Sequence, residues 1–257
     1  MGKFPLNAGS VALIVVTTLV VSSFATLVYQ GKRRATLPAQ YVALGSSFAA
    51  GLGLGARAPA SPIACFRSIN GYPQQLARLR ALSLVDMTCS GATSRHVLSG
   101  GQYFQGPQLD GLHVDTELIT LTIGGSDVGY VGDLALTAHR TQNSVVRWLL
   151  NRIWHGPQPV EKRNFSKLYE DLRTILQEIS RRAPRAKVIV VTYPAILPPA
   201  GTCSKLQVNF ADAALMRAVA DRLAEVTRDT AASWCHSRGY GHPIGGARCL
   251  RRSAPGQ

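Results

Sequence analysis

The chain has 257 residues, of which 46% are hydrophobic, enough for one α/β domain of about 200 residues with a buried core. This composition excludes a disordered protein. The formal net charge of +14 comes mostly from scattered arginines, so we expect no nucleic-acid partner.

The N-terminal segment carries no charge between Lys3 and Lys32. Its apolar stretch, from about Val11 to Tyr29, is long enough to cross a bilayer as one helix. No convincing small-x-small cleavage site follows, so we interpret residues 1–35 as an uncleaved membrane anchor, with a signal segment as the alternative. The cluster Lys32-Arg33-Arg34 by itself would place the following domain in the cytoplasm.

The cysteines bear on the compartment. No pair has C-x-x-C spacing, so the sequence predicts no zinc site. Paired cysteines in a small α/β domain would fit an oxidising compartment, and buried free thiols are the alternative. The five are Cys65, Cys89, Cys203, Cys235 and Cys249.

Short apolar runs alternate with stretches of helical spacing along the rest of the chain. This alternation predicts a parallel sheet with helices on both faces. The predicted strands are Tyr41–Leu44, Leu82–Thr88, Glu117–Ile123 and Lys187–Thr192. The predicted helices are Tyr72–Arg80, one whose apolar face runs from Leu168 to Ile179, and about Val208–Arg228. The arm at Asp133–Pro159, with apolar residues from Trp148 to Trp154, is predicted to be a lid or a surface helix.

A further strand should follow the last helix, but no apolar run of four occurs after Arg228. Residues 229–257 are instead rich in Arg, Gly, Ser and Cys. We therefore predict a domain at residues 36–228 and an atypical tail at residues 229–257. Our hypothesis is that this tail is an out-of-frame translation or a truncation.

Three of the predicted strands end in small polar turns. The turns are Gly45-Ser46-Ser47, Ser90-Gly91-Ala92 and Gly125-Ser126-Asp127. In a parallel sheet these ends lie on one edge, where α/β proteins bind ligands. We expect Ser47 to be a nucleophile, with an oxyanion hole formed by the backbone N–H groups of Ser47 and Gly91 and a side-chain donor from the third turn.

These turns lie in three ordered blocks, YVALGSSFAAG, DMTCSGAT and LTIGGSDVGY. The blocks resemble those of the SGNH (GDSL-type) esterases and lipases, and the resemblance covers about Tyr41 to Thr227. It implies a three-layer flavodoxin-like sheet, hydrolysis of carboxylic esters, and no metal or cofactor. Ser47 matches the nucleophile and Gly91 the oxyanion glycine.

The same resemblance implies a disulfide between Cys65 and Cys89. This favours a single-pass membrane protein with an extracytoplasmic catalytic domain, despite the charges that flank the anchor. The alternative is a secreted or periplasmic protein after signal cleavage.

The chain departs from the family pattern at three places. Ser46 stands where aspartate is usual, and Ser126 falls where the oxyanion asparagine belongs. The family's C-terminal D-x-x-H block, which supplies the base, is degenerate or truncated. The D-x-x-H at Asp110–His113 precedes the third block and is interpreted as a solvated turn. His242 is the candidate base.

Two further histidines are weaker candidates for the base. His236 lies in the atypical tail, and His96 is interpreted as a helix-surface histidine.

The sequence therefore predicts a serine hydrolase that cleaves lipid or other acyl esters and associates with the membrane through its N-terminal helix. The alternatives are an inactive or ligand-binding remnant of the same fold, and an acyltransferase or carbohydrate deacetylase using the same serine.

Overall fold

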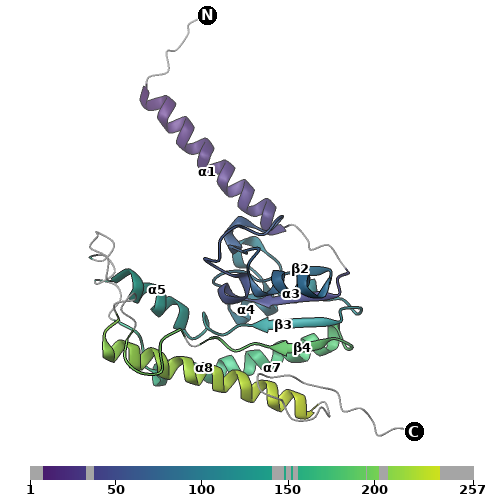
Figure 1. Ribbon diagram of the computed structural model, residues 1–257. Helices are drawn as coiled ribbons and strands as arrows, with labels where there is room; N and C mark the ends of the chain where they lie inside the picture. The colour runs from purple at the N-terminus through teal and green to yellow at the C-terminus, as the bar shows by residue number, and fades with distance from the viewer. Residues whose placement is uncertain are drawn as a thin grey trace, which may run out of the picture.

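The computed structural model describes residues 8–32, 38–140, 148, 152, 156–194, 196–202 and 208–237 (Figure 1). His242 and the expected tail from residue 238 onward lie outside the described residues, as do Cys203 and Cys249. Of the predicted arm, helix α5 (Tyr130–Arg140), Trp148, Arg152 and the segment from Gly156 are described, so most of its apolar part from Trp148 to Trp154 is not.

The centre of the described domain is a four-stranded parallel sheet with the order β2-β1-β3-β4. Each strand falls within or next to its predicted range, and the differences lie at the strand ends. The strands are β1 (Tyr41–Gly45), β2 (Leu84–Asp86), β3 (Leu118–Thr122) and β4 (Lys187–Val190). The predicted flavodoxin-like α/β architecture is confirmed.

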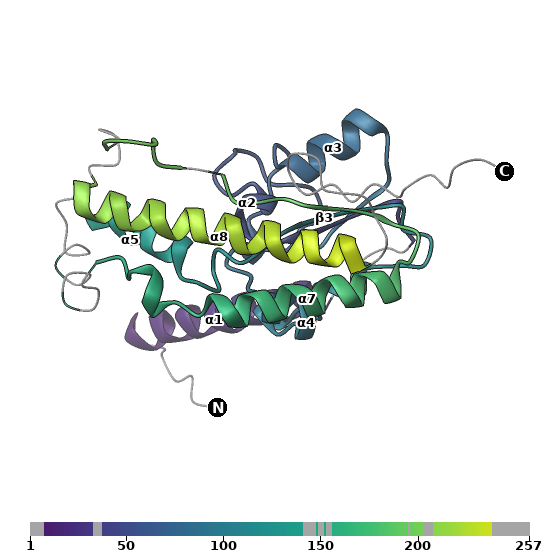
Figure 2. The same cartoon turned by 90° about the horizontal axis from the view of Figure 1, so that it is seen from below.

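Helices cover both faces of the sheet (Figures 1 and 2). Figure 2 shows the two long helices α7 (Phe165–Arg182) and α8 (Phe210–Ser237) side by side. The shorter helix α3 (Tyr72–Arg80) packs on the opposite face of the sheet. The helices of the domain, besides α5, are α2 (Ser47–Ala50), α3 (Tyr72–Arg80), α4 (Ser94–Ser99), α7 (Phe165–Arg182) and α8 (Phe210–Ser237). Short 3-10 turns are η1 (Ile63–Cys65), η2 (Gln102–Phe104), η3 (Gln108–Gly111) and η4 (Val160–Lys162).

Two apolar clusters form the core because successive strand side chains point to opposite faces. Val42 and Leu44 of β1 belong to the larger cluster, which also takes in the buried faces of α4, α7 and α8. Tyr41 and Ala43 belong to the smaller cluster under α3. The whole of β1 is buried, which fits its place inside the sheet.

Helix α8 continues past its predicted end at Arg228 to Ser237. Thr230, Ala231 and Cys235 are buried in this extension, and Nε1 of Trp234 donates to Oγ of Ser180 on α7 (3.1 Å). Small and polar side chains form this part of the packed face, so hydropathy along the sequence does not reveal it. Residues 229–237, predicted to start an atypical tail, are therefore part of a packed helix.

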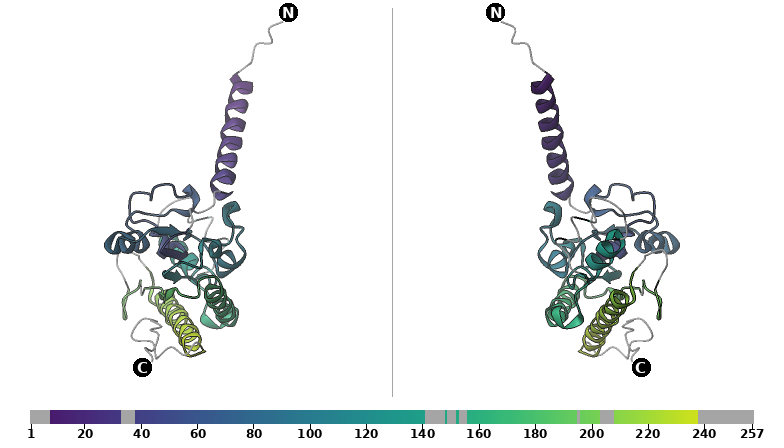
Figure 3. Two further views of the ribbon diagram at one scale, coloured as in Figure 1. Left: turned by 90° about the vertical axis from the view of Figure 1, so that its right-hand side faces the viewer. Right: turned by 90° about the vertical axis from the view of Figure 1, so that its left-hand side faces the viewer.

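The N-terminal helix α1 (Ala8–Lys32) projects away from the domain (Figure 3). Its segment Val11–Lys32 has a mean hydropathy of 2.4 and none of its apolar window is buried. This helix is long and apolar enough to cross a membrane, although a signal sequence has the same properties.

The packing of the α8 extension predicts a cost for a charge at Ala231, which is 1% exposed. Ala231→Arg should lower the free energy of unfolding by about 2 kcal/mol or more, because an unpaired guanidinium would be buried. Asp229→Ala, on the exposed side of the same turn, should change it by less than about 0.5 kcal/mol. Urea denaturation measures both, and equal stability of the two variants would contradict the packing.

Candidate active site

The position of β1 between β2 and β3 brings the three polar turns together. The backbone N–H of Ser46 donates to the Thr122 carbonyl at the end of β3 (3.0 Å). On the other side, the N–H of Cys89 donates to the Gly45 carbonyl (3.0 Å). The turn after β1 is thus bonded directly to the end of β3 and to the turn after β2, as predicted for parallel strands.

Ser47 is the first residue of α2 and is 7% exposed. At this first helical position its N–H has no acceptor within the helix and is available to a ligand. Gly45 permits the tight turn before it, because its φ is +146° and a Cβ there would collide with the Thr122 carbonyl. The backbone therefore fixes Ser47 at the strand end with one free donor.

A glutamine that sequence reasoning missed holds this turn. Nε2 of Gln108 donates to the Gly45 carbonyl (3.0 Å), and Oε1 of Gln108 accepts from the Gly45 N–H (2.7 Å). Both groups are buried, so an apolar side chain at position 108 would leave a donor and an acceptor unpaired. The sequence carried no signal for this contact, which joins residues far apart in the chain.

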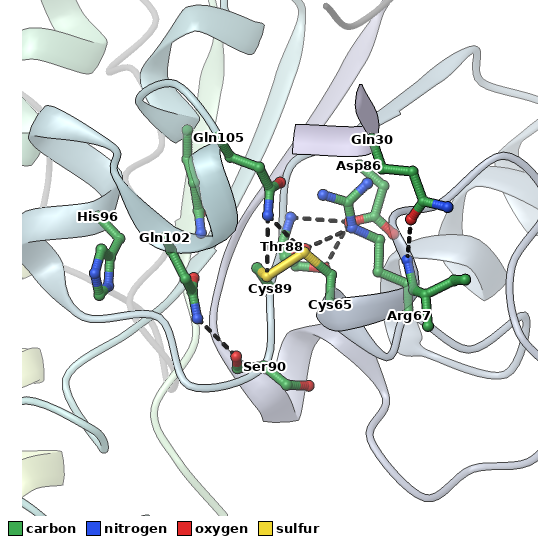
Figure 4. Close-up of a disulfide and its surroundings, with 12 residues drawn as sticks. Gln30, Cys65, Arg67, Asp86, Thr88, Cys89, Ser90, His96, Gln102 and Gln105 are labelled. Atoms are coloured by element: carbon green, nitrogen blue, oxygen red, sulfur yellow. Dashed lines mark hydrogen bonds and ion pairs between the residues drawn. A yellow bond between two sulfur atoms is a disulfide. The ribbon is translucent and has the colours of Figure 1, made fainter. Parts of the chain in front are cut away.

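The second turn is held by a disulfide between Cys65 and Cys89 (Figure 4). The Ser90 N–H also donates to the Cys65 carbonyl (3.1 Å). Nε of the buried Arg67 donates to the Thr88 carbonyl (2.5 Å). The disulfide was expected from the family resemblance alone.

Gly91 lies at the tip of this turn in the left-handed region, with φ of +80°. Among the described residues, its N–H donates to no backbone carbonyl. The amide of Gln102 reaches over the turn and donates to the Ser90 carbonyl (2.8 Å; Figure 4). Gly91 therefore offers a second free N–H, as the oxyanion hypothesis requires.

The third turn follows β3 and carries Ser126, which is half-buried. Within the described residues its hydroxyl forms no side-chain hydrogen bond. The turn is closed by backbone bonds from Val128 to the Gly124 carbonyl (3.2 Å) and from Gly129 to the Ser126 carbonyl (3.2 Å).

Asp127, next in this turn, is tied to α4 and α7 through one serine. It accepts from the N–H of Ser94 (2.9 Å) and from its hydroxyl (2.5 Å), and the same hydroxyl lies 2.7 Å from Asp171. One hydroxyl hydrogen serves only one carboxylate at a time, so a proton on a carboxyl completes the arrangement. Burial, with the charge of Asp171 adding to it, raises the pKa of Asp127, which favours the proton there.

Tyr193, directly after the fourth predicted strand, is a site residue that sequence reasoning missed. Its hydroxyl contacts Oγ of Ser46, and the neighbouring Ser47 side chain lowers its pKa slightly. Burial raises the pKa of Tyr193 to about 12, with a smaller contribution from the charge of Asp127. No local sequence pattern indicates this role, because the contact with Ser46 joins residues that are 147 positions apart in the chain.

Three of the histidines, His96, His113 and His236, lie away from the Ser47 hydroxyl in the described part of the chain. Nδ1 of His96 is 3.0 Å from both the N–H and the hydroxyl of Thr93, and so caps α4. His113 is half-buried, and its Nδ1 lies 3.2 Å from Oδ2 of the exposed Asp115. His236 is exposed on α8. None of these three hydrogen-bonds Ser47, and within the described ranges no group of three or more potential metal ligands occurs.

Comparison with known proteins identifies the family that has this arrangement. Residues 43–240 match the model of the GDSL-like Lipase/Acylhydrolase family. The chain belongs to this family. The matched range includes all three polar turns and the α8 extension, and it confirms the predicted family and the ester-hydrolase class.

Bacterial lipases are among the relatives of this family member. It is 32% identical over 203 residues to Lipase 2 of Streptomyces coelicolor, covering 77% of this chain and 68% of the relative. It is 31% identical over 193 residues to a lipase of Streptomyces rimosus, covering 75% and 66%. The chain thus spans about two thirds of the length of these curated relatives.

Solved structures agree with this assignment. The extracellular lipase of Streptomyces rimosus superposes with a TM-score of 0.58 at 28% identity, covering 76% of each chain. Phospholipase A1 of Streptomyces albidoflavus gives a TM-score of 0.58 at 27% identity, covering 77% of each chain.

The raised pKa of Asp127 predicts a pH dependence of stability. Its protonated form adds stability that is complete below the ordinary pKa of 3.8 and is lost as the pH rises through the raised value. The side chain of the Asp127→Asn variant cannot ionise. The free energy of unfolding of the wild type, relative to that of this variant, should therefore fall as the pH rises from about 3.8. Urea denaturation across this range measures the difference, and a difference independent of pH would contradict the assignment.

Proposed function

We propose that this chain is a serine hydrolase that cleaves carboxylic esters of lipids, with Ser47 as the nucleophile. The observation that carries the proposal is the pair of free N–H groups, of Ser47 and Gly91, on two turns that the sheet holds together. Such donors stabilise the negative charge that develops on an acyl carbonyl oxygen during attack.

In the proposed mechanism, Oγ of Ser47 attacks the acyl carbonyl carbon and gives up its proton to a base. The N–H groups of Ser47 and Gly91 hold the oxyanion, with the hydroxyl of Ser126 as the side-chain donor from the third turn. The alcohol leaves with the proton from the base, and water then releases the acyl group from Ser47. His242 is the base we propose.

The preference for lipid acyl groups is supported by apolar side chains beside the nucleophile. Phe48, directly after Ser47, is 39% exposed, and Leu52, whose N–H bonds to the Ser47 carbonyl, is 51% exposed. An acyl chain would cover such surface, which is otherwise in contact with water. Relatives described as lipases and as a phospholipase A1 support the same substrate class.

We further propose that α1 anchors the domain to the membrane as a single-pass helix. The C-terminal part of α1 packs on the domain: Oε1 of Gln30 accepts from the Ile63 N–H (2.8 Å), and the rings of Phe24 and Phe104 are 5.5 Å apart, edge to face. Phe104 of η2 and Phe66, directly after η1, are exposed, and both of these 3-10 turns contact α1, so their rings could enter the boundary of the bilayer. The disulfide supports an extracytoplasmic domain.

The nucleophile can be tested with a fluorophosphonate probe on the purified full chain. The wild type should be labelled and should hydrolyse p-nitrophenyl acyl esters, and Ser47→Ala should abolish both, because the attacking hydroxyl is lost and Ser46, beside it in the turn, is fully buried. Ser180→Ala, on α7, is the control and should be labelled as the wild type is. A folded wild type that is not labelled would contradict the esterase proposal.

The anchor can be tested by fractionating cells that express the full chain. We expect the protein in the membrane fraction, released by detergent but not by alkaline carbonate. Leu13→Arg with Val16→Arg should impair insertion, because each central charge costs about 3 kcal/mol. Leu79→Arg, at an exposed position of α3, should fractionate as the wild type does. A shortened protein in the medium would instead establish the secreted alternative.

A further inference from the structure

We propose that the Tyr193 hydroxyl is an oxyanion donor of this site and supplies the hydrogen bond that Ser126 is too short to give in full. The inference rests on the proposed esterase function. It assigns a catalytic role to a residue outside the three sequence blocks, on the fourth strand end of the sheet.

The packing around Tyr193 fixes its hydroxyl beside the turn that carries the nucleophile. The residue is 8% exposed, and its ring centroid lies 6.2 Å from that of Phe48 and 6.5 Å from that of Tyr130. Gly125 lies against its phenol end, since a Cβ there would be 2.6 Å from Cζ and 3.0 Å from the hydroxyl oxygen of Tyr193. The hydroxyl is therefore enclosed between the first turn and the third turn.

The partners of this hydroxyl place it at the reacting atoms. It contacts Oγ of Ser46, the residue directly before Ser47, and the Ser47 side chain is near enough to lower the pKa of Tyr193. An oxyanion that forms on a carbonyl attacked by Ser47 arises next to Oγ of Ser47. Rotation of the phenol O–H from a serine oxygen toward the oxyanion requires no movement of the ring.

The protonation state of Tyr193 suits a donor and excludes a base. With a pKa of about 12, only about one phenol in 10⁵ is ionised at pH 7. The proton is thus present throughout the physiological range. Tyr193 cannot replace the histidine that accepts the proton of Ser47, but it can stabilise the charge that results.

The two departures from the family pattern in this region fit the same role. The serine side chain at position 126 is shorter than that of asparagine, so it reaches less far toward the substrate. At position 46, aspartate would hold the phenol hydrogen in a strong charge-assisted bond. The neutral hydroxyl of Ser46 holds it less strongly, which leaves the Tyr193 O–H free to turn to the oxyanion.

The test measures kcat and KM for p-nitrophenyl ester hydrolysis by the full chain, together with thermal unfolding. Tyr193→Phe should lower kcat about 10- to 100-fold and leave KM within about twofold, because the variant loses a hydrogen bond that forms only in the transition state. Ser126→Asn should restore most of kcat in the Tyr193→Phe background. Tyr41→Phe is the matched control, since it removes a buried hydroxyl bonded to Thr120 (2.8 Å) away from Ser47, and its kcat should not change.

Two results would overturn the donor role in an active wild type. One is a Tyr193→Phe variant with unchanged kcat. The other is a loss that Ser126→Asn does not restore and that appears equally in Tyr41→Phe, which would show a purely structural effect. A wild type that neither turns over ester nor reacts with fluorophosphonate would instead overturn the esterase function, and the donor role with it.

Discussion

The Gly45 peptide is the constraint on which the site depends. Its N–H and carbonyl are both bonded to the amide of Gln108, and its carbonyl also accepts from Cys89. The next peptide is bonded to Thr122 at the end of β3. Because every one of these groups is buried, a change at any of them leaves a polar group without a partner. Ser47 is positioned by this backbone framework more than by its own side chain.

The sequence predicted the parts of the fold that depend on local pattern. The four strands follow from apolar runs, and the convergence of the turns of Ser47, Gly91 and Ser126 follows from the geometry of parallel strands. The continuation of α8 was missed because its buried face there is made of small residues such as Thr230 and Ala231. Hydropathy does not distinguish such residues from those of a loop.

The missed site residues have a common cause. Gln108, Ser94 and Tyr193 act through side chains that meet the turns only after the chain has folded. A glutamine in a 3-10 turn or a tyrosine after a strand has no local signature of such a role. The proposed base differs from these residues because His242 lies outside the described part of the chain. Its role is therefore a proposal that rests on the family pattern.

The Cys65–Cys89 bond joins two regions with different tasks. Cys65 ends η1, the turn that α1 contacts, whereas Cys89 begins the turn that presents Gly91. Closing a loop with a sequence separation of 24 stabilises a fold by about 3.5 kcal/mol in the chain-entropy model. The bond also gives the surface that α1 contacts a covalent path to the turn of Gly91. With α1 as the proposed anchor, a displacement of the domain on that helix would be transmitted mechanically to the atoms around Gly91.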